Sequence, residues 1–160
     1  MAALALLAGC RGEHGAGTTT AGGRLEEAAV AAGLVADSSS RSIAGAWALD
    51  TDRACIVPAG NADADTRIGV LIDYGQGQGC VASGTVRRHG EKLDMRLGEC
   101  RLTARFEGER IVLPPEVSAA CDRLCTGRAS LAAMTVERQS ESVAEARSLR
   151  EPGGRFLCGT

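Results

Sequence analysis

Apolar and polar residues alternate along most of the chain between residues 43 and 138, and this alternation is typical of half-buried β-strands. The run Ile43–Asp50 is the clearest example, because one face carries Ile43, Gly45, Trp47 and Leu49. Similar runs predict further strands at Ala54–Val57, Ile68–Tyr74, Cys80–Arg88, Lys92–Gly98, Glu99–Phe106, Arg110–Leu113 and Ser130–Arg138. The last run would be the closing strand, with inward positions at Leu131, Ala133 and either Met134 or Val136.

Glycine-containing turns separate these runs. Gly75–Gly79 is expected to be a hairpin connection because glycine tolerates positive φ. Strands at intervals of about ten residues with such turns predict an antiparallel meander, and closure of a meander removes its exposed edges. We therefore expect an all-β fold, a small antiparallel meander that closes into a barrel of about 7–8 strands. Short helical segments are expected near residues 118–125 and 141–150.

The first ten residues end in Leu-Leu-Ala-Gly-Cys and resemble the lipobox of bacterial lipoproteins. This apolar run is shorter than the roughly 20 residues of a transmembrane helix but fits the apolar region of a signal peptide. A basic residue is missing between Met1 and Ala2, so a start further upstream and an ordinary apolar N-terminus remain alternatives. The resemblance predicts a signal peptide at 1–9, a lipid on Cys10 and a flexible tether over 10–41, followed by a domain at 42–160.

The tether prediction rests on composition. Arg11–Gly23 is rich in Gly and Thr, and Arg24–Asp37 is expected to be a frayed helix or a linker. By resemblance to Gram-negative lipoproteins, Arg11 in place of Asp after the lipidated cysteine favours the outer membrane, facing the periplasm. The membrane, reached through the lipid on Cys10, is therefore one expected partner.

The chain contains seven cysteines, and lipidation of Cys10 would leave an even set: Cys55, Cys80, Cys100, Cys121, Cys125 and Cys158. Six cysteines can form three disulfides in an oxidising compartment, whereas a cytosolic protein would keep all seven as thiols. Six cysteines allow 15 pairings. Spacing favours Cys121–Cys125 with Cys80–Cys100 and Cys55–Cys158, and a rival set contains Cys55–Cys80.

Composition narrows the possible partners. The net charge is −2 and the chain has one Trp, one Tyr and two Phe. Binding of single-stranded nucleic acid needs a basic groove and stacking aromatics, so no nucleic-acid partner is expected. Trp47 is the one large aromatic expected to anchor the core.

No set of residues with catalytic spacing stands out. His14 lies in the tether and His89 in a predicted turn, and Gly-x-Ser-x-Gly does not occur. Cys121 and Cys125 are not spaced like the Cys-x-x-Cys of zinc ribbons. Turn chemistry explains the acidic pairs Asp50/Asp52 and Asp63/Asp65. We expect no enzyme activity, no catalytic residue, no metal and no cofactor.

Four arginines could gather on the surface. Either a cationic patch or a solvated face is formed by Arg87, Arg88, Arg123 and Arg128.

The sequence Ala44-Gly-Ala-Trp-Ala-Leu49, followed by Cys55, is similar to the opening strand of the alkaline-protease-inhibitor family of bacterial envelope proteins. The resemblance implies an eight-stranded barrel and an N-terminal segment, here Ser38–Ile43, that enters a protease cleft. The family usually has one disulfide, whereas six cysteines are available here. Pro114–Cys125 and the residues after Arg138 have no counterpart in the family pattern.

The sequence therefore predicts a non-catalytic envelope lipoprotein that binds a protein or a small ligand. Its most specific version is a peptidase or hydrolase inhibitor. The alternative is a structural or assembly lipoprotein of the envelope without inhibitory activity.

Overall fold

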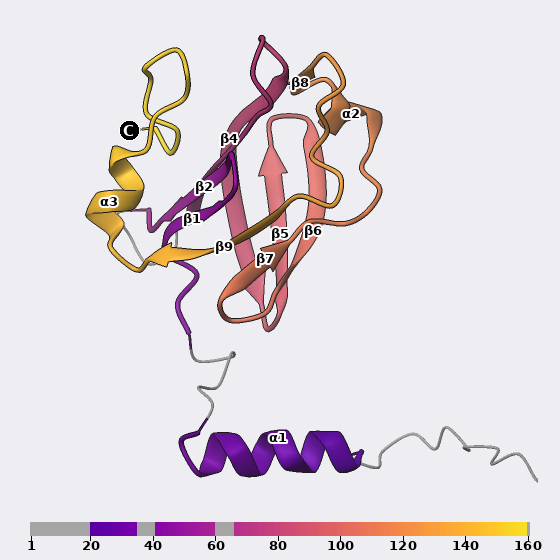
Figure 1. Cartoon of the computed structure of the whole chain (residues 1–160), viewed down its shortest axis with the longest axis vertical. Coiled ribbons are helices and arrows are strands. Elements are labelled where there is room, and N and C mark those ends of the chain that lie inside the picture. The colour runs from indigo at the N-terminus through magenta and orange to yellow at the C-terminus, as the bar shows by residue number, and fades with distance from the viewer. Residues whose placement is uncertain (1–19, 35–40, 60–65, 160) are drawn as a thin grey trace, which may run out of the picture. The chain divides into compact units, whose positions relative to one another are not determined.

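The structure, a computed structural model, describes residues 20–34, 41–59 and 66–159 (Figure 1). The chain divides into two compact units between residues 36 and 37. The predicted signal peptide and the predicted lipidation site, Cys10, lie outside the described residues, so both stay predictions.

The N-terminal unit contains one helix, α1 (Ala21–Ala31). Thr20 caps it, because its hydroxyl accepts a hydrogen bond from the amide of Gly23 at 3.2 Å. Leu25 and Leu34 are 72% and 80% exposed, and Gly33 has a φ of 68° just after the helix ends. The helix therefore begins earlier than the predicted Arg24 and presents no buried apolar face.

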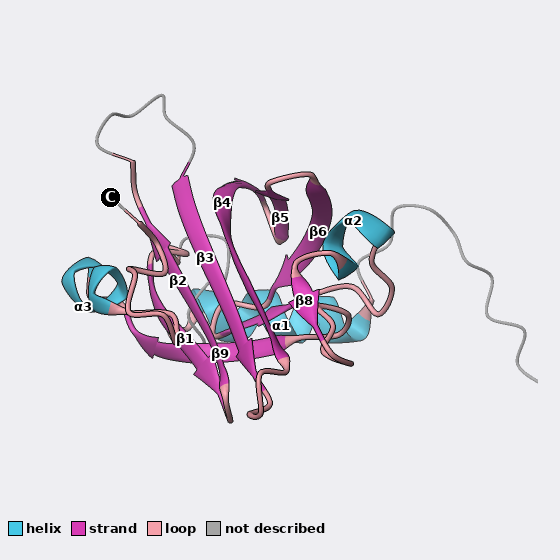
Figure 2. Cartoon of the chain, turned by 90° about the horizontal axis from the view of Figure 1, so that it is seen from above, coloured by secondary structure: helices cyan, strands magenta, loops and turns pink. Residues whose placement is uncertain are grey.

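The C-terminal unit is all-β and its sheet closes on itself (Figure 2). Its strands are β1 (Gly45–Leu49), β2 (Asp52–Val57), β3 (Thr66–Asp73), β4 (Gly79–His89), β5 (Lys92–Leu97), β6 (Cys100–Phe106), β7 (Arg110–Val112), β8 (Cys125–Thr126) and β9 (Thr135–Ser140). The antiparallel order is β3-β2-β1-β9-β7-β6-β5-β4, and pairing of β3 with β4 completes the ring. This confirms the predicted closed barrel, and β8 pairs with the start of β4 outside the ring.

The barrel interior is filled by the inward-facing side chains of all eight strands of the ring. Trp47 and Phe106 are fully buried and meet edge to face, with ring centroids 6.0 Å apart. The other large side chains with almost no exposure are Ile56, Ile68, Val70, Ile72, Val86, Leu93, Met95, Leu97, Ile111 and Leu131. Trp47 is therefore at the centre of the core, as the sequence predicts.

A second apolar layer lies outside the barrel, on β1, β2 and β3. It includes α3 (Val143–Ser148), which buries Ala146, and the C-terminal tail, defined here as residues 149–159. The outward side chains of the strands that contribute are Ala46, Cys55, Val57 and Leu71. The tail adds Leu157 and Cys158, and Figure 1 shows α3 and the tail on the same side of the barrel. We call this second cluster the outer layer.

One sequence prediction needs correction. The closing strand is Thr135–Ser140, not Ser130–Arg138, because residues 130–134 form a turn in which Ala133 has a φ of 56°. Leu131 and Met134 are nevertheless buried. A turn that buries two apolar side chains has a sequence pattern like that of a half-buried strand. The short helices expected near residues 118–125 and 141–150 are confirmed as α2 (Ala119–Asp122) and α3, and Cys125 starts β8.

Candidate functional site at the entry of the barrel

The residues that lead into β1 are part of the barrel end. We call residues 41–44 the entry segment; they include the last residues of the predicted partner-binding segment, whose residues 38–40 lie outside the described part. Ile43 and Ala44 are each 9% exposed. The indole Nε1 of Trp47 donates a hydrogen bond to the carbonyl of Ile43 at 3.1 Å. The entry segment is therefore held by the core residue that the sequence singles out.

Arg138 on β9 holds the entry segment from the side. Its side chain is 6% exposed, and its guanidinium carbon lies 4.2 Å from the centroid of Trp47. It donates hydrogen bonds to the carbonyls of Ser42 at 2.7 Å, Gly108 at 3.0 Å and Ala44 at 3.3 Å. One arginine thus joins three backbone segments at the barrel end.

The environment of Arg138 is dry for a cation. Burial lowers the pKa of Arg138, the nearby charge of Glu141 opposes the shift, and Arg41 adds to it. The buried Nε has no hydrogen-bond partner among the described residues, and the nearest carboxylate oxygen, of Glu109, is 3.4 Å away. The carbonyls and the ring of Trp47 therefore compensate part of the lost hydration of this guanidinium.

Arg88 on β4 makes a similar contact on the neighbouring aromatic. Its guanidinium carbon lies 4.5 Å from the centroid of Phe106, and it donates hydrogen bonds to the carbonyls of Arg41 and, at 2.7 Å, Gly90. Arg41 also forms an ion pair with Glu109. The chain that precedes residue 41 therefore starts from a fixed point on the barrel.

Sequence reasoning named Arg88 only as part of a cationic patch or a solvated face and missed Arg138, although the alternation contains a signal for both. Val86 and Val136 are buried inward residues, and Arg88 and Arg138 follow each of them by two positions. Alternation therefore places each arginine at an inward position near the end of its strand. Inward charges next to aromatic side chains could have been read as stacked cations.

The six cysteines of the barrel unit form three disulfides: Cys55–Cys158, Cys80–Cys125 and Cys100–Cys121. The expected Cys55–Cys158 pair is present, whereas the expected Cys80–Cys100 and Cys121–Cys125 pairs and the rival Cys55–Cys80 are wrong. Cys80 and Cys125 are partners in the β4–β8 register, with Cα atoms 4.0 Å apart. Cys121 on α2 faces the first residue of β6, Cys100, at a Cα distance of 4.6 Å.

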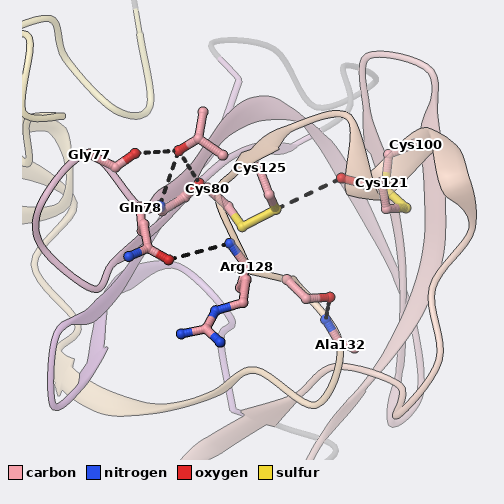
Figure 3. The surroundings of a disulfide bond; sticks show 11 residues. Gly77, Gln78, Cys80, Cys100, Cys121, Cys125, Arg128 and Ala132 are labelled. Carbon is pink, nitrogen blue, oxygen red and sulfur yellow. Dashed lines mark hydrogen bonds between the residues drawn. A yellow bond between two sulfur atoms is a disulfide. The ribbon is translucent and has the colours of Figure 1, made fainter.

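The Cys80–Cys125 disulfide lies beside the predicted glycine hairpin (Figure 3). The hydroxyl of Thr126 donates to the carbonyl of Gly77 at 2.6 Å and accepts from the amide of Gly79 at 3.2 Å. The side-chain oxygen of Gln78 accepts a longer hydrogen bond, 3.4 Å, from the amide of Arg128. Arg128 therefore lies beside the start of β4, whereas Arg88 lies near the end of that strand. The two arginines do not belong to one cationic patch.

The remaining candidates for chemistry lie in turns. His89 is exposed, and its Nε2 is 3.8 Å from a carboxylate oxygen of Asp94. Arg53 donates to the carbonyls of Asp50 and Asp52, at 2.6 Å and 2.8 Å. Burial raises the pKa of Asp52, Asp50 adds to the shift and Arg53 opposes it. His14, Asp63 and Asp65 lie outside the described residues.

Within the described ranges, no three histidine, cysteine or acidic side chains come together as a group that could hold a metal ion. No helix in those ranges has the length and apolar character needed to cross a membrane. The arrangement at the barrel entry consists of stacked cations and backbone carbonyls, which hold the entry segment in place.

Comparison of this chain with protein-family models, curated proteins and solved structures returns no match. The likeness of the first strand to the alkaline-protease-inhibitor family therefore stays a prediction.

Proposed function

We propose that this protein is a lipid-anchored protein of the bacterial cell envelope whose barrel binds another protein. Inhibition of a peptidase or another hydrolase is the most specific form of this activity. The lipid would be attached to Cys10, and the protein would face the periplasm from the outer membrane.

The observation that carries the proposal is the pairing of the six barrel cysteines. Three disulfides in one small domain are typical of exported proteins and rare in the cytosol. Their pairing leaves Cys10 as the seventh cysteine, at the end of the lipobox-like sequence. The cysteine count and the lipobox resemblance thus support the same compartment.

The packed interior favours binding at the surface. Trp47, Phe106 and the surrounding aliphatic side chains occupy the inside of the barrel, whereas a ligand carrier needs open volume there. The entry segment supports a protein partner, because Arg88 and Arg138 fix the point from which the preceding chain leaves the barrel. A fixed starting point lowers the entropy that binding costs.

The first test is an inhibition assay with the purified full-length chain against serine proteases, metalloproteases and lysozyme. We expect inhibition of one of these enzymes at micromolar protein. Arg41→Glu, which breaks the ion pair with Glu109, should weaken inhibition by about tenfold or more, the equivalent of roughly 1.4 kcal/mol. The matched control is Arg105→Glu on β6, which breaks the exposed ion pair between Arg105 and Glu107. This change should leave inhibition unchanged. Absence of inhibition across the panel would favour the structural lipoprotein instead.

The anchor is tested separately. We expect Cys10→Ser to move the protein from the membrane fraction to the soluble fraction without changing its circular dichroism spectrum. Intact mass of the native protein should show an acyl group and the loss of six hydrogens that three disulfides require. Unchanged fractionation of the Cys10→Ser chain would refute the lipid anchor but not the binding activity.

A further inference from the structure

An open groove of about 620 Å³ lies outside the barrel, between the ends of β2 and β3, α3 and the C-terminal tail. Its walls include Val57, Arg67, Ala144, Arg147 and Phe156. The volume falls in the range of about 300–1,000 Å³ that is usual for small-molecule sites. This groove is distinct from the entry segment and belongs to the outer layer.

Three elements of the fold build the groove. Val57 and Arg67 are partners in the β2–β3 register, and Arg67 points outward because the next residue, Ile68, is buried in the interior. Ala144 and Arg147 lie three residues apart on one face of α3, while Ala146 faces the barrel. Phe156 comes from the tail, which the Cys55–Cys158 disulfide holds on β2.

The charge of the groove has one sign. Arg67 and Arg147 are its only charged lining residues among those described, and its other side chains are apolar except for Ser148. In the described ranges, neither guanidinium forms an ion pair or a side-chain hydrogen bond. Phe156 is 44% exposed, and the guanidinium of Arg150 lies 3.8 Å from the centroid of its ring. An apolar wall thus lies next to two cations that have no acidic partner among the described residues.

We propose that this groove binds a free single-chain anionic amphiphile, namely a fatty acid. Its carboxylate would accept charge-assisted hydrogen bonds from Arg67 and Arg147, because a guanidinium matches a carboxylate in geometry and charge. Its hydrocarbon chain would cover Val57, Ala144 and Phe156, which removes apolar surface from water. This inference rests on the proposed function only for the location in the envelope, where such amphiphiles occur, and it requires no partner protein.

The experiment is a calorimetric titration of the full-length Cys10→Ser chain with sodium laurate below its micelle concentration. We expect saturable binding with one site. The double variant Arg67→Gln/Arg147→Gln should weaken it by about tenfold or more, since hydrogen bonds to charged groups are the stronger ones. The matched control, Arg96→Gln/Arg101→Gln, removes two positive charges from the β5–β6 pair and should bind laurate as the parent does.

Ligand controls separate charge from apolar contact. Dodecyltrimethylammonium has the same chain length with the opposite charge and should bind at least tenfold more weakly than laurate. Equal binding of the cation, equal binding by the Arg67/Arg147 variant, or no laurate binding would overturn the proposal. Binding to phosphatidylglycerol vesicles without binding of monomeric laurate would also overturn it.

A second measurement uses only the parent protein, so it tests the site even if the double variant does not fold. Amide chemical shifts of the parent should change on laurate addition at Val57, Ala144 and Phe156, and stay constant at the entry segment. Changes elsewhere only would overturn the site. Because this titration involves neither membrane fractionation nor a hydrolase, its failure is distinguishable from failure of the proposed function.

Discussion

The barrel interior and the outer layer are both apolar, but they differ in how they are held. The interior receives side chains from every strand of a closed ring, so each buried residue is surrounded by several independent neighbours. The outer layer consists of four strand residues, one short helix and the C-terminal tail. The Cys55–Cys158 disulfide attaches this tail to β2. The interior is enclosed by a ring of eight strands, whereas the outer layer is held on the outside of the barrel by the apolar packing of α3 and the tail and by one disulfide.

Removal of Trp47 should have the largest effect, because it acts on the interior. We expect Trp47→Ala to lower the free energy of unfolding by about 5 kcal/mol, the upper end of the range for large core aromatics. The added reason is that Arg138 would lose the ring on which it stacks. Urea unfolding followed by circular dichroism measures this, with Trp47→Phe as the milder control. A loss below about 2 kcal/mol would contradict a core centred on Trp47.

Removal of the tail disulfide should separate the two regions. The disulfide spans 103 residues, and the chain-entropy model gives an upper limit of about 4.7 kcal/mol for a loop of that size. We expect Cys55→Ala/Cys158→Ala to lower stability by about 3–4 kcal/mol and to remove amide exchange protection from α3 and the tail first. Protection on β4, β5 and β6 should persist.

The matched control for the tail disulfide is Cys100→Ala/Cys121→Ala, which spans 21 residues and attaches α2 to β6. This variant should leave the protection of α3 unchanged. If the tail variant instead lost protection equally in the barrel and in α3, the two regions would form a single cooperative unit.

Gly69→Ala should produce the smallest of these effects. Gly69 on β3 faces the tail, and an added Cβ would collide with the carbonyl oxygen and side chain of Leu157. We expect a loss of about 1–3 kcal/mol, typical of overpacking, with faster amide exchange at Leu157.

The matched control for Gly69→Ala is Gly84→Ala, whose Cβ would collide with the carbonyl of Arg96 within the barrel wall. This change should lower global stability and spare the tail. Faster amide exchange in the tail of Gly84→Ala but not of Gly69→Ala would contradict the contact of Gly69 with the tail.

The interior could be predicted from the sequence, because alternation needs only the neighbours along one strand. The face that carries Trp47, the glycine hairpin at Gly75–Gly79 and the closure of the meander follow from such local patterns. The predicted closing strand begins five residues before β9, because the buried Leu131 that suggests a strand lies in a turn.

The disulfides and the entry site depend on contacts between distant segments. Cys80 pairs with Cys125 through β8, a two-residue strand too short to leave a periodic pattern. Arg138 reaches Ser42 across 96 residues, and no local rule connects them. The groove likewise forms only where β3, α3 and the tail come together. The sequence contains its residues but does not predict that they are neighbours.

The seclusion of Trp47 has an optical consequence. It is the single tryptophan of the chain and is fully buried, whereas the single tyrosine, Tyr74, is 59% exposed. Emission from the indole therefore reports the state of the barrel and not that of the tail on the outside. A solution in which the tail has detached and the barrel has not should look native by tryptophan fluorescence, so that signal combined with amide exchange distinguishes partial from complete unfolding in the unmodified protein.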